Sequence, residues 1–433
     1  MNGPLRGRDF RLLSLSTGLS SLGDELALIA LTIKVAELTG SGWAVAALLL
    51  CGLLPLVIFA PSAGVIVDNF ETRRSLAIAT AIQACLAVGL AFAGELPMIL
   101  MLSFLLGTAS AVETPSIYTL VPRVVGDEHA TEANAYLEGA RYTGMIAGPV
   151  LAGSLAAGPG TRVALLVDAG TFVVIAVAAL LLRVRRQIVE PSRTTAESPA
   201  REGFRLIRSD QVLVAAFAVI GAVILFAAMD NVAEVFFARD TLRAGAWGYG
   251  LLASAWLVGM VGGATLIARR LTDDRLFRSM ALAAVVNGAA VFAAAAVGSF
   301  PLAVALFVVG GVANGVETVA MRSLIVHRVA DRFRGRAFAS YGALVNGMQI
   351  GATAAAGALV AGLGGRVALL VGGAGTALAG VAGLVAARSL DQRQTSATAN
   401  EPMAVVRVPE PTPERPDVTR LPDSEPTQRA GDP

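Results

Sequence analysis

Charged side chains interrupt several long apolar stretches of this chain. Each stretch is roughly 20 to 25 residues long, which is long enough to span a bilayer. The candidates are Asp24, Glu25, Glu113, Glu138, Arg141, Asp168, Asp230, Glu234 and Glu317. A charge at the bilayer centre costs at least about 2.5 kcal/mol on insertion scales, so each is expected to face protein or a wet cavity. A carboxyl group that has lost most of its water can exchange a proton near neutral pH. These residues therefore predict proton chemistry within a membrane.

The composition of the chain agrees with a membrane location. Hydrophobic residues make up 55% of the 433 residues and charged residues 15%, which is too little charge to cover a soluble protein of this length. Backbone groups in the hydrocarbon must be satisfied internally, and the apolar runs are too long for barrel strands, so we expect helices.

Breaks between the apolar runs predict twelve membrane-spanning helices. They are residues 12–36, 43–67, 75–94, 97–119, 134–157, 163–182, 211–236, 246–268, 276–298, 300–323, 337–361 and 366–387. The first run is long and contains Asp24 and Glu25, so we interpret it as a retained helix and not as a cleaved signal peptide.

An internal duplication relates the two halves of the chain. The hexapeptide Arg-Val-Ala-Leu-Leu-Val occurs at Arg162–Val167 and again at Arg366–Val371, and the same offset of 204 aligns Glu113 with Glu317. The repeats are apolar and run in the same order, which is typical of parallel six-helix repeats in secondary transporters. The predicted fold class is all-α integral membrane, with twelve helices as two parallel repeats.

Arginine placement predicts the orientation and the domain boundaries. Arginines gather at the chain ends and in the even-numbered gaps between spans, so both termini are expected to be cytoplasmic. Residues 183–210 form a polar linker, with a short amphipathic helix expected near Phe204 and Ile207. We expect an N-terminal half at 1–182, this cytoplasmic linker at 183–210, a C-terminal half at 211–387 and a disordered cytoplasmic tail at 388–433.

The loop after the second span resembles a motif of the major facilitator superfamily, within which the chain is similar to bacterial macrolide-efflux and siderophore-export proteins. The family pattern is G-x-x-x-D-R-x-G-R-[KR]. Gly64, Asp68 and Arg73 match it, Arg74 is a basic residue that can compensate, and Asn69, Glu71 and Thr72 depart from it. The resemblance implies that Asp68 caps a helix of the other half and latches the outward-facing state.

The fifth span contains a second motif, Gly144, Gly148, Pro149 and Gly153, which resembles the family's antiporter motif. Glycines at a spacing of four let helices approach closely, and an internal proline bends the helix. Generic tight packing is the alternative interpretation. The resemblance favours export over uptake.

In the family, the central cavity is lined by helices one, four, seven and ten, which here contain Asp24, Glu113, Asp230 and Glu317. Asp24 lies near mid-membrane, and Ser20, Ser21 and Gly23 are expected to admit water beside it. Glu113 and Glu317 form either part of the coupling site or an inherited structural hydrogen bond. Asp230 and Glu234 are either gate residues or solvated.

Two further observations limit the mechanism. Glu138 and Arg141 lie three residues apart on one predicted helix, so their opposite charges can neutralise each other at the cytoplasmic rim of the bundle. Many drug–proton antiporters of the family carry an arginine four residues before a glycine of the fourth helix, whereas here that position is Ser103. Coupling through that arginine is not expected.

Other classes of function lack the residues they need. The only lysine, Lys34, does not belong to a phosphate-binding loop. His129, His327, Cys51 and Cys85 are scattered, so no metal site, disulfide framework, cofactor or enzyme activity is expected.

The function expected from these features is proton-driven export of small amphiphilic or hydrophobic compounds across the plasma (inner) membrane. The expected partners are a small-molecule substrate, protons and the bilayer, with no nucleic acid, and the expected state is a monomer. An importer or facilitator of a small metabolite, or a lysolipid flippase, remains the alternative on the same fold.

Overall fold

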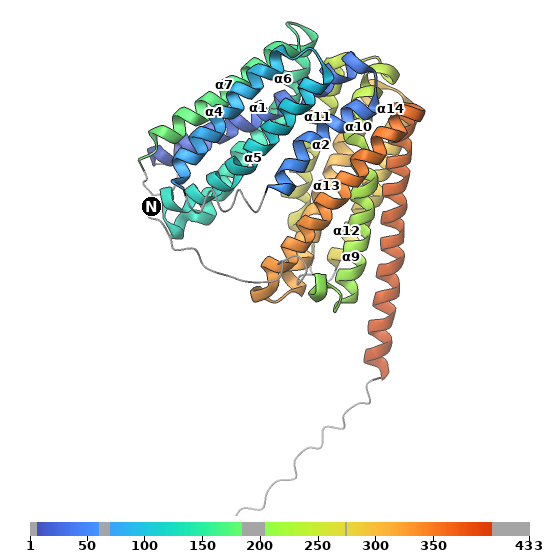
Figure 1. The fold of residues 1–433 in the computed structure, drawn as a ribbon. Helices are drawn as coiled ribbons and strands as arrows, with labels where there is room; N and C mark the ends of the chain where they lie inside the picture. The colour runs from blue at the N-terminus through green and yellow to red at the C-terminus, as the bar shows by residue number, and fades with distance from the viewer. Residues whose placement is uncertain (1–6, 60–69, 184–203, 273–274, 401–433) are drawn as a thin grey trace, which may run out of the picture. The chain divides into compact units, whose positions relative to one another are not determined.

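The computed structural model describes residues 7–59, 70–183, 204–272 and 275–400, and their regular structure is helical (Figure 1). The chain separates into two compact units, Met1–Leu390 and Asp391–Pro433. The helix bundle discussed here belongs to the first unit. Gly64 and Asp68 of the loop motif lie outside the described residues.

Each span predicted from the sequence overlaps a described helix. The first half contains α1 (Arg8–Thr39), α2 (Gly42–Ile58), α4 (Thr72–Phe92), α5 (Leu96–Val125), the 3-10 turn η2 (Asp127–His129), α6 (Ala130–Ala157) and α7 (Thr161–Leu181). The second half contains α9 (Gln211–Ala227), α10 (Asp230–Phe236), the π turn η3 (Phe237–Thr241), α11 (Gly245–Gly262), the π turn η4 (Gly263–Ile267), the 3-10 turn η5 (Ala268–Arg270), α12 (Leu276–Val297), α13 (Phe300–Arg328) and α14 (Asp331–Asn400).

Local sequence explains several helix ends. Gly40 ends α1 in the left-handed region at φ 61°, where glycine has no Cβ penalty, and its N–H bonds to Ala36 O at 2.9 Å. The Asp210 side chain caps α9 by accepting from Val212 N and Leu213 N. Within α14, Gly364 has non-helical angles of φ 81° and ψ 165°. The chain therefore turns at Gly364, between the two predicted spans.

Two features differ in detail from the expected boundaries. A turn after Ala227 separates α9 from α10, but Ala228 and Met229 keep right-handed helical angles, and Gln211–Thr241 together form one apolar segment long enough to cross a membrane. The last helix continues past Arg388 to Asn400, since Leu, Gln and Arg favour helix even where the sequence becomes polar. Residues 204–207 form one helical turn whose Ile207 is buried.

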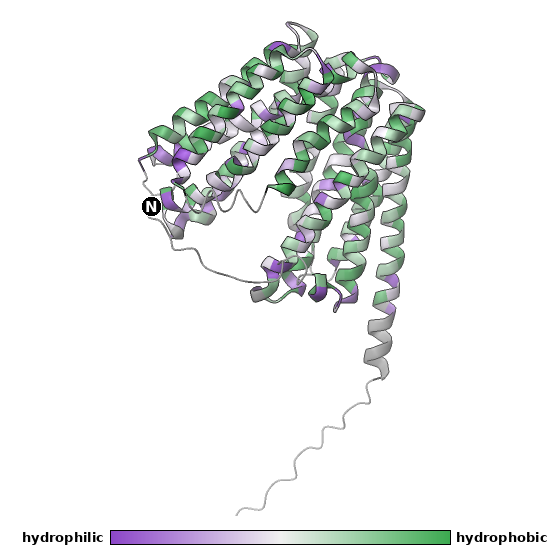
Figure 2. Ribbon diagram, in the orientation of Figure 1, coloured by the Kyte–Doolittle hydropathy of each residue, from purple (hydrophilic) through white to green (hydrophobic). Residues whose placement is uncertain are grey.

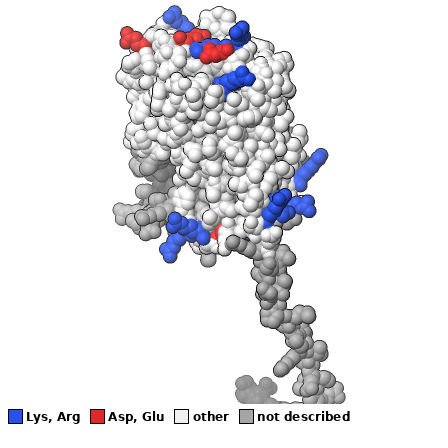
Figure 3. Space-filling model, turned by 90° about the vertical axis from the view of Figure 1, so that its right-hand side faces the viewer, with Lys and Arg blue, Asp and Glu red and all other residues white. Residues whose placement is uncertain are grey.

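Apolar surface covers the sides of the helices. Eight described helical segments are long and apolar enough to cross a membrane, and α2 is a shorter apolar helix. Figure 2 shows hydrophobic colour along the helices, with hydrophilic residues mostly near their ends. On the face in Figure 3, charged residues gather at two ends with an uncharged band between them. This pattern is that of an integral membrane protein.

Packing within each half is close. In the first half α1 packs against α6 and α7, α4 against α5 and α7, and α2 against α5. In the second half α11 and α12 pack against α13, and a Cβ on Gly373 would lie 2.5 Å from Phe292 N, so α14 lies against α12. Small residues permit these close contacts between helices. Such packing is expected in a membrane, because in lipid the hydrophobic effect does not hold helices together.

The two halves meet near the end of the bundle where α1 ends and α2 begins, here called the Thr39 end. A Cβ on Gly42 of α2 would lie 2.7 Å from Val360 Cβ on α14. α6 packs extensively against α11. The Arg239 guanidinium of η3 donates to Ala36 O of α1 at 3.0 Å. The Thr39 end therefore joins the halves in this conformation.

Candidate functional site

Two carboxyl–amide pairs occupy equivalent places in the halves. Gln83 Nε2 on α4 donates to Glu113 Oε2 on α5 at 2.8 Å, and Asn287 Nδ2 on α12 donates to Glu317 Oε1 on α13 at 3.4 Å. Both acids are buried, at 7% and 1% exposure. The offset of 204 relates both acids and both amides. The shared bond favours a structural role inherited by both halves for Glu113 and Glu317.

Asp24 lies near the middle of α1, and its side chain is exposed. Leu28, four residues further along α1, is exposed as well. Glu113 on α5 and Asp168 on α7 are buried. Asp24 is therefore the exposed member of these three acids.

The expected role of the residues before Asp24 is wrong. Ser20 and Ser21 were expected to admit water, but they are only 2% and 6% exposed, and Gly23 is buried as well. A Cβ on Gly23 would lie 2.6 Å from Asp168 Oδ1 on α7. The physical reason is packing, because small side chains in a membrane helix also permit close contact with a neighbouring helix.

Asp230 and Glu234 lie on α10, next to the contact between the halves. Both side chains are partly buried, and Asp230 Oδ1 and Glu234 Oε1 are buried atoms with no hydrogen-bond partner among the described residues. A Cβ on Gly372 of α14 would lie 3.2 Å from Asp230 Oδ1. These acids are therefore not fully solvated.

The glycines of the fifth span let α6 contact two helices. A Cβ on Gly148 would lie 3.0 Å from Leu22 O of α1, and Gly144 contacts the same helix at Gly18. A Cβ on Gly153 would lie 2.6 Å from Ala246 O of α11. One side of α6 therefore packs within its own half, and its Gly153 end packs against the other half.

Pro149 lies where α6 meets α11, and Ser254 of α11 bonds to the helix backbone beside it. Ser254 Oγ donates to Ile146 O at 2.8 Å and accepts from Val150 N at 3.1 Å. Pro149 cannot donate to Met145 O, and the Ser254 hydroxyl bonds to the two backbone groups of the next i to i−4 pair of the helix. Ser254 is 5% exposed, so these two hydrogen bonds are buried between the halves.

The remaining candidates lie at helix ends or on the rim. Arg74 Nε lies 2.8 Å from Glu71 Oε2, and Arg73 donates to Leu182 O at 2.6 Å, just after α7. Glu138 and Arg141 lie 3.4 Å apart, and both also bond to the Tyr118 hydroxyl. Ser103, at the position of the family's arginine, is buried. Glu71, which departs from the motif, thus binds both neighbouring arginines.

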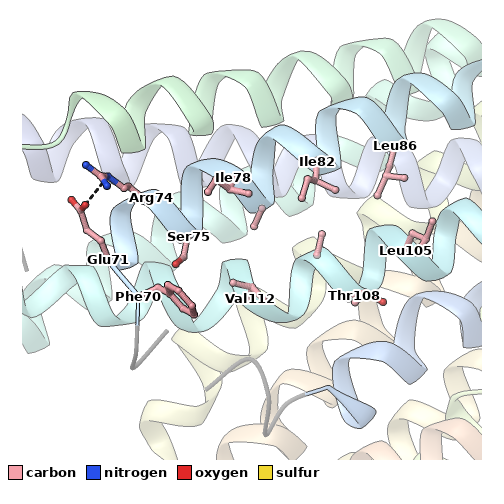
Figure 4. Close-up of a pocket in the computed structure, with 12 residues that line it drawn as sticks. Phe70, Glu71, Arg74, Ser75, Ile78, Ile82, Leu86, Leu105, Thr108 and Val112 are labelled. Carbon is pink, nitrogen blue, oxygen red and sulfur yellow. Dashed lines mark ion pairs between the residues drawn. The ribbon is translucent and has the colours of Figure 1, made fainter. Parts of the chain in front are cut away.

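A groove of about 630 Å³ runs between α4 and α5 (Figure 4). Ile78, Ile82 and Leu86 from α4 and Leu105 from α5 line it, with the Glu71–Arg74 ion pair at one end. Gln83 and Glu113 do not line this groove. The groove is therefore separate from the buried carboxyl–amide pair of the first half.

A bundle of apolar helices that encloses carboxyl groups is typical of a membrane transporter and not of an enzyme. The family model for the Major Facilitator Superfamily matches residues 13–296. The chain belongs to the Major Facilitator Superfamily, which confirms the resemblance inferred from its motifs.

Relatives in sequence include an efflux protein and an uncharacterized transporter. Macrolide efflux protein A of Streptococcus pyogenes is 29% identical over 132 residues, which cover 29% of this chain and 33% of that protein. The match thus spans about a third of that relative. The uncharacterized MFS-type transporter YfiS of Bacillus subtilis is 22% identical over 396 residues, covering 88% of this chain and 93% of the relative.

Solved structures share the fold over most of the chain. The nucleoside transporter NupG has a TM-score of 0.69 at 13% identity, covering 88% of this chain and 99% of that one. A bacterial homologue of the iron transporter ferroportin, in an inward-facing state, has a TM-score of 0.68 at 16% identity, covering 88% and 98%. At these identities the similarity concerns the fold alone.

Sequence reasoning missed the partners of the acids. Gln83 and Asn287 were detectable, because the offset that aligns Glu113 with Glu317 aligns them too. Ser254 and Gly23 gave no comparable signal. Their roles depend on which helices cross, and the sequence does not specify the crossings.

Proposed function

We propose that the chain is a secondary transporter that exports small amphiphilic or hydrophobic compounds in exchange for protons. The observation that carries this proposal is the packing of α6, whose antiporter-type glycines contact α1 while Pro149 and Gly153 lie against α11. One bent helix thereby links the helix that contains Asp24 to the opposite half. The macrolide efflux relatives support the direction of transport.

We infer that twelve helices cross the membrane as two six-helix halves, residues 1–182 and 211–387, joined by the linker 183–210. The break at Gly364 supports two crossings within α14. The equivalent bonds of Glu113 and Glu317 support the repeat. Alternating access then consists of rocking between the halves around a cavity between them.

Proton exchange is assigned to Asp24, with Asp230 and Glu234 as further members of the coupling or substrate cavity. Glu113 and Glu317 contribute chiefly through their bonds to Gln83 and Asn287. Among Asp24, Glu113 and Asp168, Asp24 is the exposed acid, so we assign to it the exchange of protons with either side as the halves move.

The cellular location follows from the same features. The protein is an integral membrane protein, and we infer a bacterial plasma membrane with both termini in the cytoplasm. On the face in Figure 3, one end shows almost only Lys and Arg, while the other shows both signs. An excess of positive charge marks the cytoplasmic side. We infer a monomer.

Cells that express the protein should accumulate less ethidium or erythromycin than cells with an empty vector. A protonophore should abolish the difference, because it removes the proton gradient that drives exchange. Accumulation of both probes is measured at matched expression. Faster uptake of a polar metabolite without efflux would favour an importer, and faster movement of a fluorescent lysolipid alone would favour a flippase.

Ser254→Ala should loosen the Thr39 end. The bond between Ser254 and α6 exists only while the halves are in contact, and a hydrogen bond contributes about 0.5 to 1.5 kcal/mol net. We expect the closed population at this end to fall roughly twofold to tenfold. The separation of the two halves at this end is measured by double electron–electron resonance. The spin labels replace Trp43 on α2 and Leu363 next to Gly364, in a variant that lacks Cys51 and Cys85.

Ser154→Ala is the matched control for this measurement, because the Ser154 hydroxyl bonds to Val150 O within α6 itself at 2.7 Å. It should leave the distribution of label distances unchanged. Equal distributions for both alanine variants would contradict the role assigned to Ser254.

A further inference from the structure

Lys34 and Arg366 each bind the carboxyl-terminal end of a helix in their own half. Lys34 Nζ on α1 donates to Leu90 O near the end of α4 at 2.9 Å. Arg366 Nε on α14 donates to Ala295 O near the end of α12 at 2.9 Å. The last carbonyl groups of a helix lack partners within the helix and carry a partial negative charge. A cation at such a place therefore stabilises the helix end.

Arg239 of η3 binds a helix end that belongs to the opposite half. Its Nη1 donates to Ala36 O of α1 at 3.0 Å, and the same oxygen accepts from Gly40 N at 2.9 Å. A carbonyl oxygen has two lone pairs, so the two donors complete its hydrogen bonding. Because α1 ends at Thr39, the guanidinium group lies at the negative end of the helix dipole. Arg239 therefore caps α1 from the second half.

The guanidinium group of Arg239 is held in place by its own half. Its Nε and Nη2 donate to the two carboxylate oxygens of Asp240 at 2.6 and 3.1 Å, and Arg239 Cζ lies 5.2 Å from the centre of the Phe236 ring. Phe236 is 4% exposed and belongs to a buried core cluster. A planar guanidinium group can make this contact with two bonds and still direct a third N–H group at another acceptor. Asp240 and Phe236 thus direct Nη1 toward α1.

The two repeats use their basic residues at the Thr39 end differently. The offset of 204 aligns Arg162 with Arg366 and α4 with α12. The Arg162 guanidinium group lies 4.9 Å from the centre of the Phe92 ring, and Lys34 caps α4 in the first half. In the second half Arg366 caps the equivalent helix α12. Of the three capping side chains, Arg239 is the one whose bond joins the halves.

We propose that Arg239 is a latch of the Thr39 end and stabilises the conformation in which the halves are closed there. When the halves separate at this end, the bond to Ala36 O breaks, whereas the bonds to Asp240 remain because both residues lie on η3. The contact with α1 thus exists in one conformer only, as a contact must if it is to shift an equilibrium between two conformers. The inference rests on the proposed alternating access and assigns a residue to this gate.

The test compares Arg239→Gln and Arg239→Glu with the unaltered protein, each purified at full length in one detergent without a transported compound. Spin labels in place of Trp43 and Leu363, in the cysteine-free variant, report the separation of the halves by double electron–electron resonance. Lys34→Gln is the matched control, because it removes a helix cap of the same kind that lies within one half. The Arg239 side chain is 37% exposed, so its variants are expected to fold, and their unfolding temperatures are measured to verify this.

Arg239→Gln should lower the ratio of closed to open populations at the Thr39 end about threefold to tenfold, since it removes a charge-assisted hydrogen bond at a helix end. Arg239→Glu should lower this ratio further, because a negative charge then faces the negative end of α1. Lys34→Gln should leave the distribution of label distances unchanged. Distances that stay closed in both Arg239 variants, or that open equally in Lys34→Gln, would overturn the proposal.

This measurement needs neither a transported compound nor a proton gradient, so a negative efflux assay does not affect its outcome. Opening of the Thr39 end by Ser254→Ala, without opening by either Arg239 variant, would overturn the latch and leave alternating access in place. Closed distances in all three variants would contradict the rocking of the halves as well. Failure of the latch and failure of the proposed function are therefore distinguishable.

Discussion

Asp24→Asn is expected to abolish proton-driven export, reducing it to the level of cells without the protein. Asparagine has nearly the shape of a protonated aspartate but cannot release a proton, so the cycle of uptake and release stops. Substrate binding and passive exchange should remain, because they need no net proton movement. Efflux driven by an imposed pH gradient and counterflow without a gradient, both in liposomes, measure the two activities separately.

Glu113→Gln and Glu317→Gln are the comparison variants for this prediction. Each glutamine retains an oxygen that can accept from Gln83 or Asn287, so both variants should transport more than Asp24→Asn does. Full gradient-driven efflux in Asp24→Asn, together with its loss in either glutamine variant, would move the coupling site to α5 or α13.

Gly144→Ala is expected to destabilise the first half strongly. An added Cβ would overlap the Gly18 backbone oxygen and lie 2.8 Å from Leu22 N, and these are backbone atoms that cannot move aside alone. Forcing extra volume into a packed contact costs about 1 to 3 kcal/mol. The unfolding temperature of the purified protein in one detergent measures the loss.

Gly139→Ala on the same helix provides a control of the opposite sign. No atom lies within 4 Å of its Cβ position, and alanine favours helix over glycine by about 0.5 to 1 kcal/mol. This variant should be as stable as the unaltered protein or more stable. Equal destabilisation by both substitutions would show that helix propensity, and not the contact with α1, controls stability here.

Helix positions were predictable because the bilayer imposes one requirement on every span, which is an apolar run of sufficient length. The split between α9 and α10 was not predictable in this way. Residues 211–236 form one apolar run, and hydropathy does not detect a backbone turn near Ala227. Gly372 of α14 packs beside this turn, since its Cβ position is 2.9 Å from Phe226 O. The surroundings of the turn are therefore formed by a tertiary contact.

The candidate site was predictable only as a set of residue types. Asp24, Glu113 and Glu317 stood out because acids are rare in apolar spans. Which of them stays accessible depends on neighbours such as Gln83, and these come from helices distant in sequence. The position of Asp168 opposite Gly23 likewise emerged only from the structure.

The sequence by itself determined the helical membrane architecture, the superfamily and the duplication, because hydrophobic length, loop motifs and a repeat of 204 residues are properties of the linear chain. The tertiary structure alone decided which polar groups meet. It paired Gln83 with Glu113, set Ser254 against the backbone of α6 beside Pro149, and brought Asp168 to Gly23. The physical reason is that side-chain partners depend on which faces of the helices cross, and in lipid these crossings are set by close packing of small residues, which hydropathy does not encode.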